Sequence, residues 1–479
     1  MPDTSSMEPQ DKAAFRAEAH AALDAALDHL EGRSDAPVWK AMPIAAQAVF
    51  QAPLPQKGQE HAVLDGIIRT SLLPYDVGNT HPRFFGWVHG SGTAQGIIPE
   101  IYAAAMNANL GGRDHGANYV ERQVIEWCRT MFGFPDKAGG LIVSGTSMAT
   151  VIAIKAARDK LGGLEVRKSG MVGTVGLVGY ASSEAHSCVA RAFDILGLGV
   201  NSLRKIPVDD DFRMDLTALH RAIAKDKAEG LQPFCLIGTV GSVNMGAIDP
   251  LSELADIAAK FGLWLHIDGA FGALAILHPD TAPLVNGVER ADSLAFDFHK
   301  WMHVNYDAGF VLVRDGEDQR RAFAERPEYL EGATRGLAAG NPWFCDYGPE
   351  LSRGFRALKV WYQMAHFGLD KIGANIAQNC AQARHLADLI NKTHSLELLA
   401  PVTLNITCFR VNPGGLSEAS LDRLNGDIVI TLQESGFAAP STTRVNGKLA
   451  IRVNITNHRT KDADLDFLVF EIMRLADRL

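Results

Sequence analysis

Cysteine is scarce in this chain, and its placement excludes two kinds of small cross-linked fold. Only six cysteines occur among 479 residues, and no two of them have the C-x-x-C spacing. We therefore predict neither a disulfide framework nor a zinc site, and we expect no metal. Scattered thiols are typical of a protein whose cysteines stay reduced in the cytoplasm, which is the location we expect.

Long apolar runs and clusters of basic residues are also lacking. No uninterrupted stretch of about eighteen apolar residues occurs, which argues against a membrane span. The first residues are polar and acidic, so no signal peptide is indicated. Lysine and arginine total 46 against 55 aspartate and glutamate, a net charge of -9. Without a basic patch, we expect neither nucleic-acid nor membrane partners.

The remaining composition is that of an ordinary globular protein. Hydrophobic residues make up 47% of the chain and charged residues 21%, and 479 residues suffice for two or three structural units. Residues 11–72 are rich in alanine, with apolar residues near one helical face and prolines that interrupt the pattern. This segment has no obvious core of its own.

Short apolar runs alternate with helical stretches from about residue 86. The predicted strands are residues 140–144, 174–180, 234–238, 263–267, 293–298 and 309–313. Strands that alternate with helices indicate an α/β fold with a mostly parallel central sheet. A helical stretch over 351–390, followed by alternating runs at 403–411 and 448–456, suggests a small α+β unit. We thus divide the chain into an N-terminal helical segment (1–85), a large domain (86–350) and a small C-terminal domain (351–479).

Two charged residues close neighbouring predicted strands. Asp268 ends the run WLHID and Lys300 follows the run SLAFDFH, thirty-two residues later. The carboxyl ends of parallel strands converge on one crevice. A lysine there can form a Schiff base with the aldehyde of pyridoxal phosphate, and a carboxylate can keep the pyridine nitrogen protonated. Two ordinary strand-end charges remain the alternative for the pair taken alone.

Six ordered segments resemble the group II decarboxylases that depend on pyridoxal phosphate, the aromatic-L-amino-acid and glutamate decarboxylase family. The segments are THPRFF (80–85), ERQVIEW (121–127), AHSCVAR (185–191), GTVG (238–241), WLHIDGA (264–270) and HKW (299–301), and LSRGFRALK (351–359) adds to them. The resemblance implies the aspartate-aminotransferase-type fold (fold type I) and decarboxylation of an amino acid. It also implies a homodimer with shared active sites, in which the N-terminal segment clasps the partner.

The same resemblance implies roles for four catalytic residues. Lys300 would carry the cofactor, and a desolvated lysine loses its proton more readily. Asp268 would face the pyridine nitrogen, and His186 would stack on the ring. Tyr329, on a polar loop dotted with glycine, would come from the partner subunit and protonate the substrate carbon after CO2 leaves. A satisfied core histidine and a plain surface loop are the alternatives for the last two.

The resemblance further implies which residues bind the cofactor. The strand-to-helix turn SGTS (144–147) offers amides, hydroxyls and a helix N-terminus to a phosphate, with Thr146 and Ser147 as its donors. Thr239 would border the ring and Ala270 would lie under it, where a small side chain is needed. His299 and Asp297 would lie near the phosphate, although mammalian members carry Asn-Pro where this chain has Asp297-Phe298.

The sequence predicts three substrate-binding residues and leaves alternatives open for the substrate. Trp87 and His89 fall in the pocket segment FFGWVHG, with Trp87 where aromatic-acid decarboxylases place a tyrosine. Arg452 matches an arginine that contacts the substrate carboxylate in glutamate decarboxylases, and a structural salt bridge is the alternative. The polar segment 109–117 suits a hydroxylated aromatic or an acidic amino acid. We predict decarboxylation of an aromatic amino acid to its amine.

Three other functions share parts of this pattern. An aldehyde synthase on the same scaffold would also deaminate oxidatively, but His186 and Tyr329 favour simple decarboxylation. A cysteine desulfurase or aminotransferase shares the lysine, but the segment 351–359 resembles neither. A protein that binds pyridoxal phosphate without catalysis is disfavoured, because Lys300, Asp268 and His186 are all present.

Overall fold

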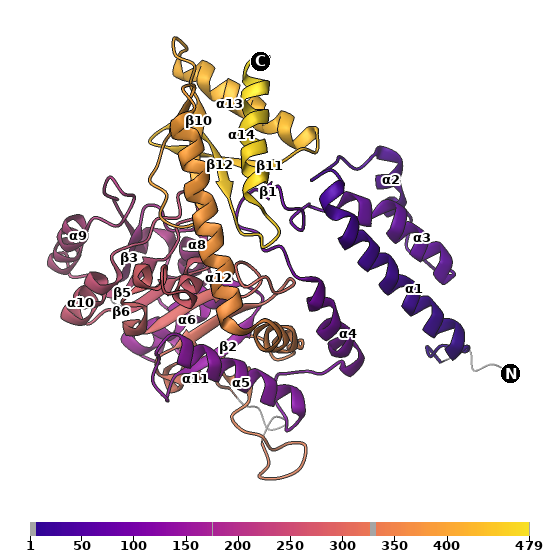
Figure 1. Cartoon of the computed structure of the whole chain (residues 1–479). Coiled ribbons are helices and arrows are strands. Elements are labelled where there is room, and N and C mark those ends of the chain that lie inside the picture. Colours follow the sequence, from indigo (N-terminus) through magenta and orange to yellow (C-terminus); the bar gives the residue numbers. More distant parts are fainter. Residues whose placement is uncertain (1–5, 175, 326–331, 479) are drawn as a thin grey trace.

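The computed structural model describes residues 6–174, 176–325 and 332–478, and its first helices stand beside the main body (Figure 1). They are α1 (Lys12–Glu31), α2 (Ile44–Ala48) and α3 (His61–Ser71). No residue of α1 is buried within the single chain. A helix that finds no core in its own chain gains little from hydrophobic burial, so these helices need another surface to pack against.

A seven-stranded sheet forms the centre of the main body, in the order β2-β8-β7-β6-β5-β3-β4. Its strands run parallel except β8, which lies antiparallel between β2 and β7. The central strands are buried along their whole length, as expected where helices cover both faces. The bounds are β2 (Gly139–Val143), β3 (Leu177–Ser182), β4 (Leu203–Ile206), β5 (Gln232–Thr239), β6 (Trp264–Asp268), β7 (Ser293–Asp297) and β8 (Gly309–Val313).

Helices cover the two faces of this sheet with separate apolar cores. On one face, α6, α8 and α11 pack over side chains such as Val143, Phe234 and Trp264. On the other face, α5, α9, α10 and the first part of α12 (Arg356–Lys392) bury side chains such as Leu236 and Phe296. The bounds are α4 (Ile97–Met106), α5 (Gly116–Met131), α6 (Thr146–Leu161), α7 (Val166–Ser169), α8 (Ser187–Ile195), α9 (Leu216–Ala228), α10 (Leu251–Phe261) and α11 (Gly316–Phe323).

A five-stranded sheet forms the second unit, in the order β1-β11-β12-β10-β9. Its first strand, β1 (Phe84–Phe85), pairs in parallel with β11, so the end of the predicted N-terminal segment joins the C-terminal sheet. The long helix α12 bends at Gly368, whose φ of 72° is non-helical, and links the two units. The bounds are α12 (Arg356–Lys392), β9 (Leu396–Leu398), β10 (Ile406–Val411), α13 (Glu418–Glu434), β11 (Ala439–Val445), β12 (Lys448–Asn454) and α14 (Asp462–Ala476).

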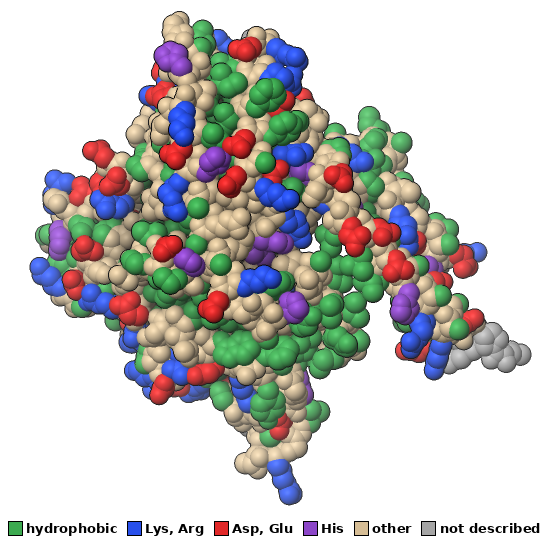
Figure 2. Space-filling view, viewed as in Figure 1, with side chains coloured by type: hydrophobic (Ala, Val, Ile, Leu, Met, Phe, Trp, Pro, Cys, Tyr) green, Lys and Arg blue, Asp and Glu red, His purple; other side chains and the backbone are tan. Residues whose placement is uncertain are grey.

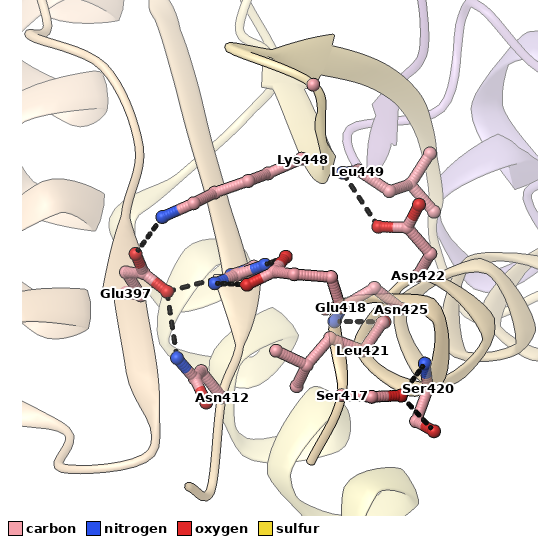
Figure 3. Close-up of polar contacts among 12 residues, drawn as sticks. Glu397, Asn412, Ser417, Glu418, Ser420, Leu421, Asp422, Asn425, Lys448 and Leu449 are labelled. Atoms are coloured by element: carbon pink, nitrogen blue, oxygen red, sulfur yellow. Dashed lines mark hydrogen bonds and ion pairs between the residues drawn. The ribbon is translucent and has the colours of Figure 1, made fainter.

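An ion-pair network ties three strands of the small sheet together (Figure 3). Glu397 on β9 accepts hydrogen bonds from Arg410 Nε on β10 at 2.7 Å, from Asn412 at 2.9 Å and from Lys448 Nζ on β12 at 3.0 Å. Arg410 also donates to Glu418 at the start of α13. Partial burial of Glu397 would raise its pKa, but these donors outweigh burial and lower the pKa to about 2.

We expect Glu397→Gln to destabilise the folded protein in a pH-dependent way. The folded-state pKa of Glu397 lies below its usual 4.5, so the carboxylate stabilises the fold above pH 4.5, and this stabilisation is lost as the pH falls toward 2. Because the group is partly exposed, we expect the free energy of unfolding to fall by about 1–2 kcal/mol at neutral pH. Denaturant titrations at pH 7 and pH 3 measure this difference.

Glu165→Gln is the matched control for that titration. Glu165 pairs with Lys168 at 3.5 Å, but both side chains are about four-fifths exposed, so its loss should leave the midpoint of unfolding in place. Equal midpoints for wild type and Glu397→Gln at pH 7, or a difference that grows as the pH falls, would contradict the stabilising role of the network.

Candidate active site

The carboxyl ends of β2, β3, β5, β6 and β7 open into one cavity of about 540 Å³. A cleft is expected at this edge, where the loops that follow parallel strands diverge. The cavity brings together all but two of the site residues predicted from the sequence. These lining residues are Trp87, His89, Thr146, Ser147, His186, Thr239, Asp268, Ala270, Asp297, His299 and Lys300.

Lys300 follows the end of β7 and lies on the cavity wall. Its Nζ is 2.9 Å from Oδ2 of Asp297. Burial lowers the pKa of Lys300, but the carboxylates of Asp297 and Asp268 outweigh burial, and the pKa is raised. We expected burial to make Lys300 lose its proton. In the polypeptide without cofactor this expectation is wrong, because the carboxylate of Asp297 stabilises the protonated ammonium form of Lys300.

Asp268 ends β6 and is only 3% exposed. Its Oδ1 accepts from the Ala270 amide at 3.2 Å, and its Oδ2 lies 3.7 Å from the Cys188 thiol. Burial raises the pKa of Asp268, although the charges of Lys300 and His186 oppose this. A buried carboxylate with so few donors is stabilised by a cation, and a protonated ring nitrogen in the cavity would supply one.

His186 caps the N-terminus of α8 and faces the same cavity. Its Nδ1 accepts from the Cys188 amide at 3.2 Å, which leaves the proton of the neutral ring on Nε2. Burial lowers the pKa of His186, so the neutral form is favoured. Sequence reasoning missed Cys188, although it lies within the AHSCVAR motif. This residue touches both partners: its amide holds His186 and its thiol faces Asp268.

The turn between β2 and α6 forms the other end of the cavity. The Thr146 amide donates to Oδ1 of Asp297 at 2.7 Å, and the Gly145 backbone approaches the Asp297 and His299 side chains. The hydroxyls of Thr146 and Thr239 are buried without a hydrogen-bond partner among the described residues. Thr146 lies at the N-terminus of α6 and Thr239 at the end of β5, and buried hydroxyls without partners are donors that suit an anionic group. The cavity thus offers donors at one end and a buried carboxylate at the other, which fits pyridoxal phosphate.

His299 joins this end of the cavity to the loop before β8. Its Nε2 is 3.7 Å from Oδ2 of Asp297, and its Nδ1 lies 3.1 Å from the Ala308 amide. Burial lowers the pKa of His299, which favours a neutral ring. The Tyr306 ring packs on His299, with 4.4 Å between ring centroids, and lines the cavity as well. Sequence reasoning missed Tyr306, because no motif marks the loop that carries it.

Arg452 does not line the cavity. It is buried, and its guanidinium donates to the carbonyls of Trp87 at 2.8 Å and of Val243 at 2.6 Å. Burial lowers the pKa of Arg452 to about 10. Trp87 and Val243 both line the cavity, so this geometry favours a structural role in which Arg452 holds the cavity wall. A direct contact with the substrate stays a prediction.

Two further predictions concern Tyr329 and the segment 109–117. Tyr329 lies outside the described residues. The polar segment 109–117 does not line the cavity of the single chain, and Asn109 instead accepts from the Arg353 amide.

Among the described residues, no helix has the length and apolarity that a membrane crossing requires. Nor does the described part of the chain contain a group of three or more His, Cys, Asp or Glu side chains that could hold a metal ion.

Known proteins share this sequence and this fold. The family model of the pyridoxal-dependent decarboxylase conserved domain matches residues 43–412. The aromatic-L-amino-acid decarboxylase of Bacillus atrophaeus is 32% identical over 465 residues, which cover 96% of this chain and 94% of that protein. The phenylacetaldehyde synthase of Arabidopsis thaliana is 27% identical over 469 residues, or 94% of this chain and 93% of that protein.

A solved structure agrees with these matches. The crystal structure of Oryza sativa TDC with PLP and tryptamine superimposes with a TM-score of 0.90 at 26% identity, and covers 99% of each chain. The predicted fold type I is thereby confirmed. The chain belongs to the pyridoxal-dependent decarboxylase family, and it is a carboxy-lyase that uses pyridoxal phosphate to decarboxylate an amino acid.

Proposed function

We propose that the amino acid is aromatic and that the products are its amine and CO2. The observation that carries this proposal is the mouth of the cavity, where Trp87, His89 and Tyr306 lie together. Among the described residues that line the cavity there is no arginine, and the one lysine, Lys300, is paired with Asp297. Arg452 is the nearby cation, and backbone carbonyls already accept from its guanidinium. An acidic side chain would lose its hydration there without gaining an ion pair. The similarity to the aromatic-L-amino-acid decarboxylase of Bacillus atrophaeus supports the same choice.

The residues at the floor of the cavity have distinct roles in this proposal. Pyridoxal phosphate, when bound, supplies a protonated ring that accepts the electron pair released as CO2 leaves. Lys300 would carry the cofactor covalently, and Asp268 would hold the proton on the ring nitrogen. His186 would cover one ring face and exclude water, while the small side chain of Ala270 would leave room on the other.

The donors at the other end would hold the phosphate. Thr146 and Ser147 lie at the N-terminus of α6, where the helix dipole and exposed amides favour an anion. Thr239, at the end of β5, and His299, just after β7, would border the cofactor. In this proposal the carboxylate of Asp297 has two contacts: it pairs with Lys300 and accepts a hydrogen bond from the Thr146 amide. It would link the lysine to the phosphate end.

An aldehyde synthase is the second candidate. The similarity to the phenylacetaldehyde synthase of Arabidopsis thaliana supports this alternative. We place amine formation first, because His186 faces the cavity and the chain has Tyr329 to protonate the substrate carbon. Removal of that phenol should move product from amine to aldehyde.

We further propose that the protein is a homodimer with shared active sites. Hydrophobic side chains gather over α4 and on the neighbouring N-terminal helices (Figure 2), among them Ile101, Tyr102 and Met106 of α4 and Leu64 and Ile68 of α3, all at least two-fifths exposed. Exposed apolar surface of this kind marks an interface. All six cysteines are free thiols, which fits the cytoplasm as the place of action.

A substrate panel tests the proposed function. The holoenzyme is incubated with each of the twenty amino acids, DOPA and 5-hydroxytryptophan, and CO2, amine and aldehyde are measured. We expect an aromatic amino acid to give CO2 and amine in equal amounts, and the Lys300→Ala variant to give neither. Release of CO2 from glutamate or aspartate alone would overturn the aromatic assignment. Aldehyde in place of amine would favour the synthase.

Subunit mixing tests the shared sites. Lys300→Ala and Tyr329→Phe subunits are each expected to form little amine, for different reasons. In a mixed dimer, one site has Lys300 from one subunit and Tyr329 from the other, so random mixing should recover roughly a quarter of the wild-type amine formation. Re-mixed Lys300→Ala subunits alone are the control. No recovery, with mixed dimers demonstrated by mass, would mean that Tyr329 acts within its own subunit.

A further inference from the structure

We propose that His89 and Tyr306 form a polar pair that hydrogen-bonds a hydroxyl group on the aromatic ring of the substrate. This inference rests on the proposed function and narrows its substrate class to hydroxylated aromatic amino acids. It assigns a specificity-determining role to Tyr306 that no sequence motif indicates.

His89 lies in a group of rings at the mouth of the cavity. Its ring centroid is 5.6 Å from that of Phe84, 5.8 Å from that of Trp87 and 6.3 Å from that of Tyr306. Burial and the charge of Lys300 lower the pKa of His89, so its ring is neutral near pH 7. Neither ring nitrogen has a hydrogen-bond partner among the residues that the structure describes. A neutral imidazole presents one donor and one acceptor, and both remain available in the cavity.

Tyr306 lies across the cavity mouth from His89, in the loop between β7 and β8. Its hydroxyl oxygen accepts from the Gly90 amide at 3.3 Å, so the phenol proton is left to donate. Tyr306 is 48% exposed in the single chain, and the partial burial of its phenol raises the pKa of Tyr306, so the phenol stays protonated. The Tyr306 ring packs on the His299 ring, with 4.4 Å between their centroids.

The spacing between the two polar groups is set by the backbone. A side chain at Gly90 would collide with the carbonyl oxygen of His299, since a Cβ there would lie 1.6 Å from that atom. The irregular segment that follows β1 and carries His89 is therefore packed directly against the loop that carries His299 and Tyr306. Two neutral polar groups held at one place by packed backbone form a preorganised recognition site.

A phenolic hydroxyl on the substrate matches this pair better than the groups on other amino-acid side chains. A hydroxyl can donate to the free nitrogen of His89 and accept the phenol proton of Tyr306. A plain phenyl ring would bury both groups without partners, which costs affinity. The carboxylate of an acidic substrate side chain would find no unpaired cation among the described residues of the cavity. Sites that hydrogen-bond a substrate hydroxyl discriminate strongly against the analogue that lacks it.

Direct competition measures this discrimination. The holoenzyme receives equal concentrations of L-tyrosine and L-phenylalanine in one vessel, and in a second experiment 5-hydroxytryptophan and tryptophan. The ratio of the two amines gives the ratio of kcat/KM values and does not depend on how much of a variant is folded. We expect wild type to favour the hydroxylated member of a pair, and Tyr306→Phe and His89→Phe each to lower that preference about tenfold.

Tyr180→Phe is the matched control. Its hydroxyl donates to Asp226 at 2.8 Å and does not line the cavity, so its removal should leave the amine ratio at the wild-type value. Equal ratios in wild type, Tyr306→Phe and His89→Phe would overturn the pair, even if total turnover falls, since a contact to the cofactor or the α-carboxylate affects both substrates alike. If neither these four amino acids nor DOPA nor histidine is consumed, the proposed function itself fails.

Discussion

Asp268 and Asp297 end the neighbouring strands β6 and β7, and both carboxylates are buried beside the ammonium of Lys300. Charges are stable in such a place only when each is balanced by another. Asp297 balances Lys300 directly, whereas Asp268 has an amide and a thiol within reach. The site is therefore short of one cation at Asp268, and the protonated ring of the cofactor would provide it. Helices that pack apolar cores on both faces of the sheet hold the strands that carry these charges.

Different parts of the cavity carry out the reaction and select the substrate. Its floor is charged and comes from strand ends, which a packed sheet holds rigidly. Its mouth is aromatic and neutral, and it is formed by loops that include His89 and Tyr306. Loops tolerate substitution better than buried strands do, so the substrate can change while the floor stays the same. Arg452 connects the small sheet to this mouth through the carbonyls of Trp87 and Val243.

Much of this arrangement could be predicted from the sequence, because short apolar runs that end in Asp268 and Lys300 carry a strong local pattern. The pattern did not reveal Tyr306 or Cys188, whose roles come from contacts between distant segments. Nor did it reveal the raised pKa of Lys300, since burial alone predicts the opposite and the carboxylates of Asp297, at 2.9 Å, and Asp268 reverse it. The strand β4 was missed because it is four residues long and its two middle residues, Arg204 and Lys205, are charged, and the two-residue β1 was too short to mark as a strand.

The central claim is that Lys300, held by Asp297 at the end of β7, carries the cofactor. The most direct test is to reduce the native holoenzyme with borohydride, digest it and identify the lysine that retains the pyridoxyl group by mass spectrometry. We predict that the label is found on the peptide that contains Lys300, and that Lys300→Ala retains no covalent label. A label on any other lysine of the wild-type protein would contradict the account.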